Sequence, residues 1–224
     1  MMTRQPIRTR LLPHYTRGEE KFHMVTHIVG AGMGVIALVL CIVLAALHGN
    51  PAGIWTGTVF GVSMIALYTM SSVYHGLKDG VAKRVMQVFD HCTIYLLIAG
   101  TYTPLLVCGV RTISPAACWV NFAIVWAFAV LGTTLTAIDL RHFRVFSMIC
   151  YIGMGWSIIF SSSIARAALG STGFALLLAG GIFYTVGAVF YGMGKKKKYC
   201  HGVFHVFILL GSLCHILCVL LCVM

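Results

Sequence analysis

Two histidines and a preceding serine–histidine pair are the residues most able to do chemistry in this chain. His201 and His205 are four residues apart in YCHGVFHVFILLGSLCHI, so on a helix both side chains lie on one face. Such an HxxxH pair can hold a metal ion, although the pattern is common and needs further ligands at the same depth. His75 ends an apolar stretch that reads SSVYHGL, and Ser71 lies one helical turn before it. The four side chains predict a polar site where these two stretches meet.

A carboxylate stands at the start of a third apolar stretch. Asp90 and His91 open FDHCTIYLLIAGTYTP. Three neutral imidazoles with one position left for water are the ligand set of a catalytic zinc site, and zinc lowers the pKa of its bound water to about 7. The expected zinc ligands are His75, His201 and His205. Asp90 would hold the water and accept its proton, and Ser71 would hydrogen-bond a ligand, the water or a substrate carbonyl.

Each of these residues also has a simpler interpretation. A single histidine at this depth is commonly a satisfied interfacial residue. Asp90 suits the N-cap of its helix, and Ser71 can bond back to a carbonyl of its own helix. His91 is an alternative to one of the three histidine ligands. Cys92 and Cys200, beside His91 and His201, are more remote alternatives.

The remaining histidines are weaker candidates. His215 shares the helical stripe of the HxxxH pair, but it is ten residues beyond His205, roughly 15 Å deeper, and cannot share the metal. His27 lies two residues into the first apolar stretch, where it would face the site or bond across helices. We expect a structural role for both. The sequence assigns no role to His14, His23, His48 and His142.

The elements that must position these residues are membrane helices. The chain has 224 residues, of which 59% are hydrophobic and only 9% charged, whereas about 25% are charged in a soluble domain. Seven stretches free of Lys, Arg, Asp and Glu are each near the roughly 20 residues that span a bilayer. They are roughly 25–48, 54–75, 91–110, 117–138, 145–165, 171–192 and 203–223. The predicted fold is an all-α, polytopic seven-helix bundle, with an N-terminal cytoplasmic segment 1–24 and one membrane domain 25–224.

Basic residues alternate between the segments that join these stretches. Only Arg111 and Arg166 fall on one side, and fourteen of the sixteen basic residues fall on the other. The positive-inside rule therefore predicts a cytoplasmic N-terminus and an external C-terminus. The net charge of +11 serves topology and attraction to anionic lipid headgroups, so we expect membrane lipids as partners and no nucleic acid. The run Lys195–Lys198 is expected to be a solvated anchor.

The order of these motifs resembles the hemolysin III family, the bacterial branch of the progestin and adipoQ receptor superfamily, which is also similar to the alkaline ceramidases. The motifs are SxxxH, FDHxxIYLLIAGTYTP and HxxxH on seven spans, and the resemblance extends from THIVGAG to GSLCHI. It implies a zinc ion near the cytoplasmic face, held by residues that match His75, His201 and His205. It also implies that Asp90 lies beside the zinc water and that Ser71 supports it. One departure is Phe204, where relatives often carry Trp, and we expect it to change packing only.

Three functions of different classes follow from this site. The leading hypothesis is a membrane-embedded zinc hydrolase acting on an amide or ester bond of a lipid. The alternative is a receptor-like or regulatory protein in which zinc is structural. A pore or cytolysin, as the family name suggests, is disfavoured because no charged residue lies within any predicted span.

Overall fold

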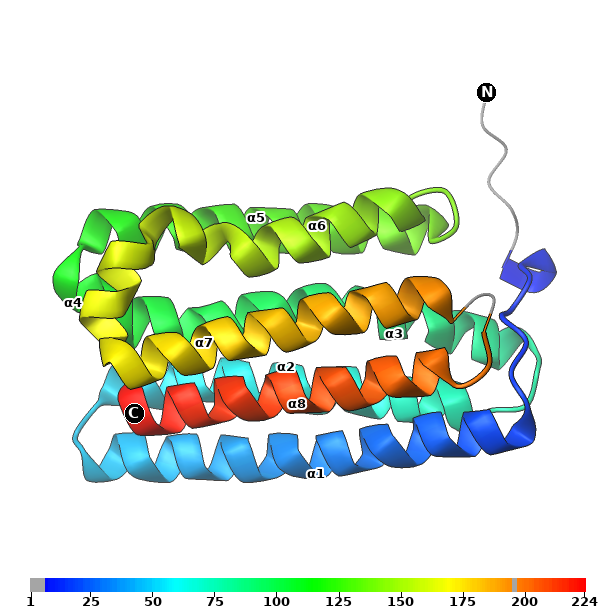
Figure 1. The fold of residues 1–224 in the computed structure, drawn as a ribbon, viewed down its shortest axis with the longest axis horizontal. Helices are drawn as coiled ribbons and strands as arrows, with labels where there is room; N and C mark the ends of the chain where they lie inside the picture. The colour runs from blue at the N-terminus through cyan, green and yellow to red at the C-terminus, as the bar shows by residue number, and fades with distance from the viewer. Residues whose placement is uncertain (1–6, 195–196) are drawn as a thin grey trace.

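Helices make up all the regular structure that the computed structural model describes, over residues 7–194 and 197–224. In Figure 1 the long helices run side by side along the long axis of the molecule. The elements are η1 (Ile7–Thr9), α1 (Arg17–Leu47), α2 (Pro51–Gly76), α3 (Val81–Pro104), η2 (Leu105–Val110), α4 (Arg111–Ile113), α5 (Pro115–Asp139), α6 (Arg144–Trp156), η3 (Ser157–Ser161), α7 (Ser162–Met193) and α8 (Cys200–Cys222). The prediction of an all-helical chain is confirmed for these residues.

Six helical runs in the described residues are long and apolar enough to cross a membrane. Five of them each contain most or all of one predicted stretch. The sixth, Arg144–Met193, is 50 residues long and contains both 145–165 and 171–192. Gly170, in the predicted gap between those two, has φ 69° and ψ 177°, a conformation that glycine adopts without steric cost. The chain changes direction near this point in Figure 1, so the long run is not one straight helix.

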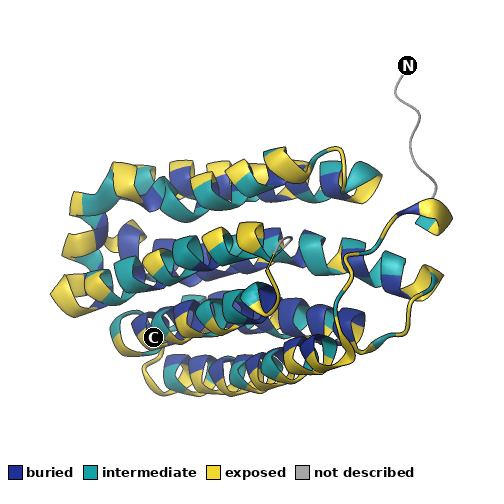
Figure 2. Ribbon diagram, turned by 45° about the vertical axis from the view of Figure 1, so that its right-hand side comes forward, coloured by how far each residue is buried: buried dark blue, intermediate teal, exposed yellow. Residues whose placement is uncertain are grey.

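The outer surface of the bundle is apolar. Large side chains such as Ile149 (66% exposed), Val130 (65%) and Phe160 (94%) face outward. Figure 2 shows the buried positions turned toward the interior and the exposed ones outward along each helix. An apolar outer surface of this extent is stable in lipid and not in water. The chain is a multi-pass membrane protein.

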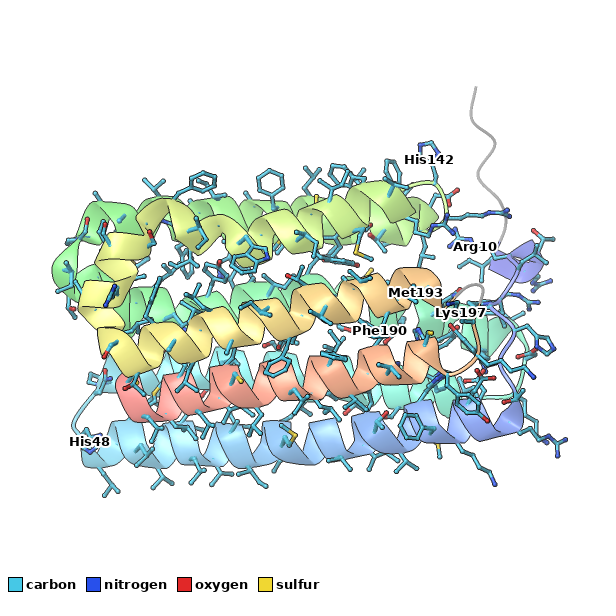
Figure 3. All side chains as sticks on the ribbon, in the orientation of Figure 1. Arg10, His48, His142, Phe190, Met193 and Lys197 are labelled. Carbon is cyan, nitrogen blue, oxygen red and sulfur yellow. The ribbon has the colours of Figure 1, made fainter. Side chains whose placement is uncertain are left out.

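The two ends of the bundle differ in charge. Figure 3 places Arg10, His142 and Lys197 at one end, which we call the basic end, and His48 at the other. The C-terminus lies with His48, whose Nδ1 is 2.9 Å from the carbonyl oxygen of Met224. Of the predicted basic segments, Arg4, Lys195 and Lys196 lie outside the described residues.

The first helix begins earlier than its apolar stretch. Thr16 and Glu19 form a capping box: the Glu19 N–H donates to Thr16 Oγ1 at 3.3 Å, and the Thr16 N–H donates to Glu19 Oε2 at 2.9 Å. This cap starts α1 at Arg17, so two turns of helix precede residue 25. The other oxygen of Glu19 accepts the N–H of Tyr199 at 2.9 Å. The starts of α1 and α8 are thereby joined at the basic end.

Candidate metal centre

Five buried histidines meet near the basic end, where α1 and α8 begin and α2 ends. They are His23 and His27 of α1, His75 of α2, and His201 and His205 of α8. One ligand nitrogen from each of His23, His75 and His201 lies within 4.8 Å of the other two. The Nε2 atoms of His201 and His205 are 3.1 Å apart. Three helices therefore bring enough imidazole nitrogens together to hold a metal ion.

The orientation of His75 is fixed by a carboxylate. Its Nδ1 lies 2.7 Å from Glu20 Oε2, so the Nδ1–H donates to this oxygen and Nε2 keeps its lone pair. Lys83 Nζ donates to the other Glu20 oxygen at 2.5 Å and to the Leu77 carbonyl at 3.0 Å. A carboxylate behind a histidine in this way sets the tautomer and increases the basicity of a metal ligand.

A threonine fixes the ring of His205 through Nδ1, as Glu20 does for His75. The Thr26 hydroxyl donates to the carbonyl oxygens of Phe22 and His23, each at 2.9 Å. Its oxygen can then accept the Nδ1–H of His205 at 3.3 Å. This assignment leaves Nε2 of His205 as the free nitrogen, which faces Nε2 of His201.

Several of these nitrogens have no protein partner within the described part of the chain. Both ring nitrogens of His23 and of His27, and Nε2 of His75, are buried without a hydrogen bond. A buried polar atom without a partner costs about 1–3 kcal/mol, and a bound metal ion removes that cost for each nitrogen that it takes as a ligand. Imidazole nitrogens are ligands that zinc prefers, so the residues fit a zinc ion.

Asp90 and Ser71 lie beside the histidines and interact with each other. Asp90 Oδ2 is also 3.5 Å from Nδ1 of His91. The interpretation of Asp90 as an N-cap is wrong, because α3 begins at Val81 and Asp90 lies inside it. Its side chain is 15% exposed and lines the cavity described next.

His91, the alternative ligand, is engaged elsewhere. Its Nδ1 is 2.9 Å from the carbonyl oxygen of Gln87, and its Nε2 is 3.3 Å from the hydroxyl oxygen of Tyr191. The thiol of Cys92 points to α5, with Sγ 3.6 Å from the Thr133 carbonyl oxygen. The group able to hold a metal in the described residues contains neither of them and not Cys200.

A cavity joins this site to the interior of the bundle. The space within it, open mouth included, is about 1680 Å³. Ser71, Asp90, His201 and His205 lie on its wall. The cavity continues between mainly apolar side chains to His215, whose Nε2 is 3.3 Å from the Leu177 carbonyl oxygen. The arrangement can place an apolar chain in the bundle with its polar end at the histidines.

Tyr15, in the segment before α1, covers the histidines from the basic end. Its ring stacks on His201 with centroids 5.1 Å apart and meets His23 edge-on at 5.0 Å. Burial raises the pKa of the Tyr15 hydroxyl above its usual value, so it is protonated and neutral at physiological pH. The segment that carries it is attached to the bundle through Arg10, which donates from Nη2 to the Ile138 carbonyl at 3.2 Å.

Of the predicted ligands, His75 and His201 belong to the geometric metal group, whereas His205 lies beside it, with its Nε2 3.1 Å from that of His201. The third member of the group is His23, to which the sequence assigned no role. A signal was present: His23 and His27 form a second HxxxH pair, and the Thr16–Glu19 capping box places both on a helix. His27 stacks on His205 with ring centroids 3.7 Å apart. It therefore lies against the site, which is one of the two positions that the sequence predicts for it.

Known proteins resemble this chain in sequence along most of their length. The family model described as "Haemolysin-III related" matches residues 15–216. The chain is 40% identical to "Hemolysin-3" of Bacillus cereus over 202 residues, which cover 90% of each protein. It is 37% identical to the "Hemolysin-3 homolog" of Bacillus subtilis (strain 168) over 209 residues, covering 92% of this chain and 95% of the relative. Similarity extends to the human "Monocyte to macrophage differentiation factor", with 27% identity over 180 residues, 76% of this chain and 73% of the relative.

Proposed function

The chain belongs to the haemolysin-III-related family, and from that membership and the geometry of its histidine site we propose that it is a membrane-embedded zinc hydrolase. Its substrate would be a lipid, cleaved at an amide or ester bond. The observation that supports this most is the cavity, which has Asp90 and two of the proposed ligands on its wall and is otherwise mainly apolar. Such a cavity suits an acyl chain whose carbonyl stops at the histidines.

The proposed topology has seven spans, with the N-terminus in the cytoplasm and the C-terminus outside. The non-helical backbone at Gly170 supports it, because a turn there would divide the 50-residue run into two passes. The position of Arg10, His142 and Lys197 at one end supports the orientation (Figure 3), since basic segments stay in the cytoplasm. The site would then open toward the cytoplasmic headgroups.

The proposed zinc ligands are His75, His201 and His205. A zinc ion bound there would lower the pKa of a water ligand to about 7. Asp90 would accept the proton of the attacking water and pass it to the leaving nitrogen or oxygen. The water oxygen bonds to the acyl carbon, the carbon–nitrogen or carbon–oxygen bond breaks, and a fatty acid and an amine or alcohol result. Ser71, through its interaction with Asp90, would hold that carboxylate toward the cavity.

The test is release of fatty acid from a panel of lipid amides and esters by purified, zinc-loaded protein, followed by mass spectrometry. We expect turnover by the wild type, and a loss of about 10²-fold or more in Asp90→Asn, the range for a positioned acid–base group. His205→Ala should lose both metal and turnover. The hydrolase proposal fails if His205→Ala removes the metal and leaves turnover unchanged.

The second candidate is a receptor-like or regulatory protein in which zinc ties the helices together. The supporting observation is that the histidines come from three different helices, α1, α2 and α8, which a metal would cross-link. This function predicts a lower Tm after metal removal and no turnover of any lipid in the panel. A pore would release dye from liposomes containing the purified protein, and we expect no release.

A further inference from the structure

Four of the five histidine rings surround one point. The centroid distances are 4.7 Å for His23–His75, 4.7 Å for His23–His201, 5.0 Å for His23–His205, 5.4 Å for His75–His201, 5.1 Å for His75–His205 and 4.7 Å for His201–His205. The six separations are nearly equal, so the ring centres approximate a tetrahedron. Of the nitrogens, one from each of His23, His75 and His201 lies within 4.8 Å of the other two, and Nε2 of His205 is 3.1 Å from Nε2 of His201. Four imidazoles bound at about 2.1 Å to one tetrahedral zinc have centroids roughly 5 Å apart.

His23 completes this tetrahedron and has no other visible task. Its side chain is fully buried, and neither ring nitrogen has a hydrogen-bond partner in the described residues. Its helix is held against α8 by the bond between Glu19 and the Tyr199 N–H. Gly202 lets the helices approach closely, since a Cβ there would lie 2.8 Å from Phe22 Cδ1. A buried histidine held so firmly beside three others is positioned to share their ion.

His27, the fifth histidine, does not fit this role. Its ring lies parallel to that of His205, at 13° and with centroids 3.7 Å apart. Two imidazoles that bind one ion point their nitrogens at a common centre, so their centroids are farther apart than in a face-to-face stack. His27 therefore supports the His205 ring from behind.

We propose that His23 is a fourth metal ligand, so that the resting ion is closed by four imidazoles and has no bound water. The inference rests on the metal site of the proposed function and deepens it. Closed four-ligand sites are structural, whereas catalytic sites keep a position for water. Hydrolysis at this site would need a position for water, which a chain without the His23 imidazole would have.

Cobalt(II) substitution distinguishes the two coordination states, because X-ray absorption counts the imidazoles and visible absorption responds to an exchanged ligand. We expect four imidazoles in the wild type and no spectral change when azide is added. His23→Ala should show three imidazoles and an oxygen ligand, and its spectrum should shift with azide. Its zinc affinity, from competition with a chelator, should fall by more than about tenfold, or 1.4 kcal/mol. His142→Ala, at an exposed histidine in the turn between α5 and α6, should keep four imidazoles and the silent response to azide.

A wild type with three imidazoles and an azide-sensitive spectrum would overturn the proposal. So would a His23→Ala protein with an unchanged imidazole count. The wild-type measurement decides the matter even if the variant does not fold. A protein that binds no cobalt or zinc would overturn the metal site as a whole, whereas absence of lipid turnover by a four-imidazole protein would overturn only the hydrolase.

Discussion

At the scale of residues, the site depends on groups that orient the histidines. Glu20 is the most important of them, because its two oxygens bind His75 Nδ1 and Lys83 Nζ. Lys83 is almost fully buried, with 3% of its side chain exposed, so the ion pair neutralises a charge that is costly to bury alone. The Glu20 carboxylate thus leaves Nε2 of His75 free for the metal and neutralises the charge of the buried Lys83.

Replacing Glu20 by Gln keeps the shape of the side chain and removes its charge. We expect zinc affinity to fall by about 10–100-fold, the usual effect of losing a group that orients a ligand. The measurement is a chelator-competition titration of the purified protein in detergent.

Asp79→Asn is the matched control for that substitution. Asp79 is also acidic and lies 3.8 Å from Lys83 Nζ, but it is 81% exposed and does not contact the histidines. It should leave zinc affinity unchanged, because exposed ion pairs contribute little. Equal affinities for Glu20→Gln and the wild type would show that His75 needs no carboxylate.

At the scale of elements, the contact between α1 and α8 sets the distance between the two HxxxH pairs. The contact is closest at Gly202, where added atoms would meet Phe22 and, at 3.5 Å, Cδ2 of His23. Because backbones approach closely only where one side chain is missing, a larger residue here must move the helices apart.

Gly202→Ala is expected to lower the Tm and to weaken zinc binding together. The added methyl group would overpack against Phe22, which typically costs 1–3 kcal/mol of stability. The resulting movement of α1 away from α8 would separate His23 from His201. Gly32→Ala on α1 is the control, since a Cβ there meets nothing within 4 Å and alanine favours helix. A Gly202→Ala protein with wild-type Tm and zinc affinity would contradict the role given to this contact.

At the scale of the whole molecule, the apolar composition of the chain predicts more of the structure than the spacing of its histidines does. The apolar stretches became apolar helical runs, since hydropathy along the chain is enough to identify membrane helices. Hydropathy does not predict the place of His23, because the apolar residues start at residue 25 whereas α1 begins at Arg17. The capping box that extends α1 to Arg17 is local and was readable. The cover that Tyr15 forms, and the choice of nitrogen at His75 and His205, depend on contacts between distant segments, which no single stretch specifies.

The proposed topology predicts which segments share a side of the membrane. Short epitope tags at the N-terminus and in the loop at His142 should be reached only after the membrane is permeabilised. A tag at the C-terminus should be reached in intact cells, because Met224 lies at the opposite end of the bundle with His48. A C-terminal tag protected in intact cells would contradict the seven-span topology.

The central claim is that these histidines hold one metal ion, and the metal content of chelator-washed protein tests it most directly. The comparison needs the wild type, His75→Ala and His142→Ala, since His142 is exposed and lies away from the site. We predict about one zinc per chain in the wild type and in His142→Ala, and much less in His75→Ala. A wild type without metal, or a His75→Ala protein that keeps it, would contradict the claim.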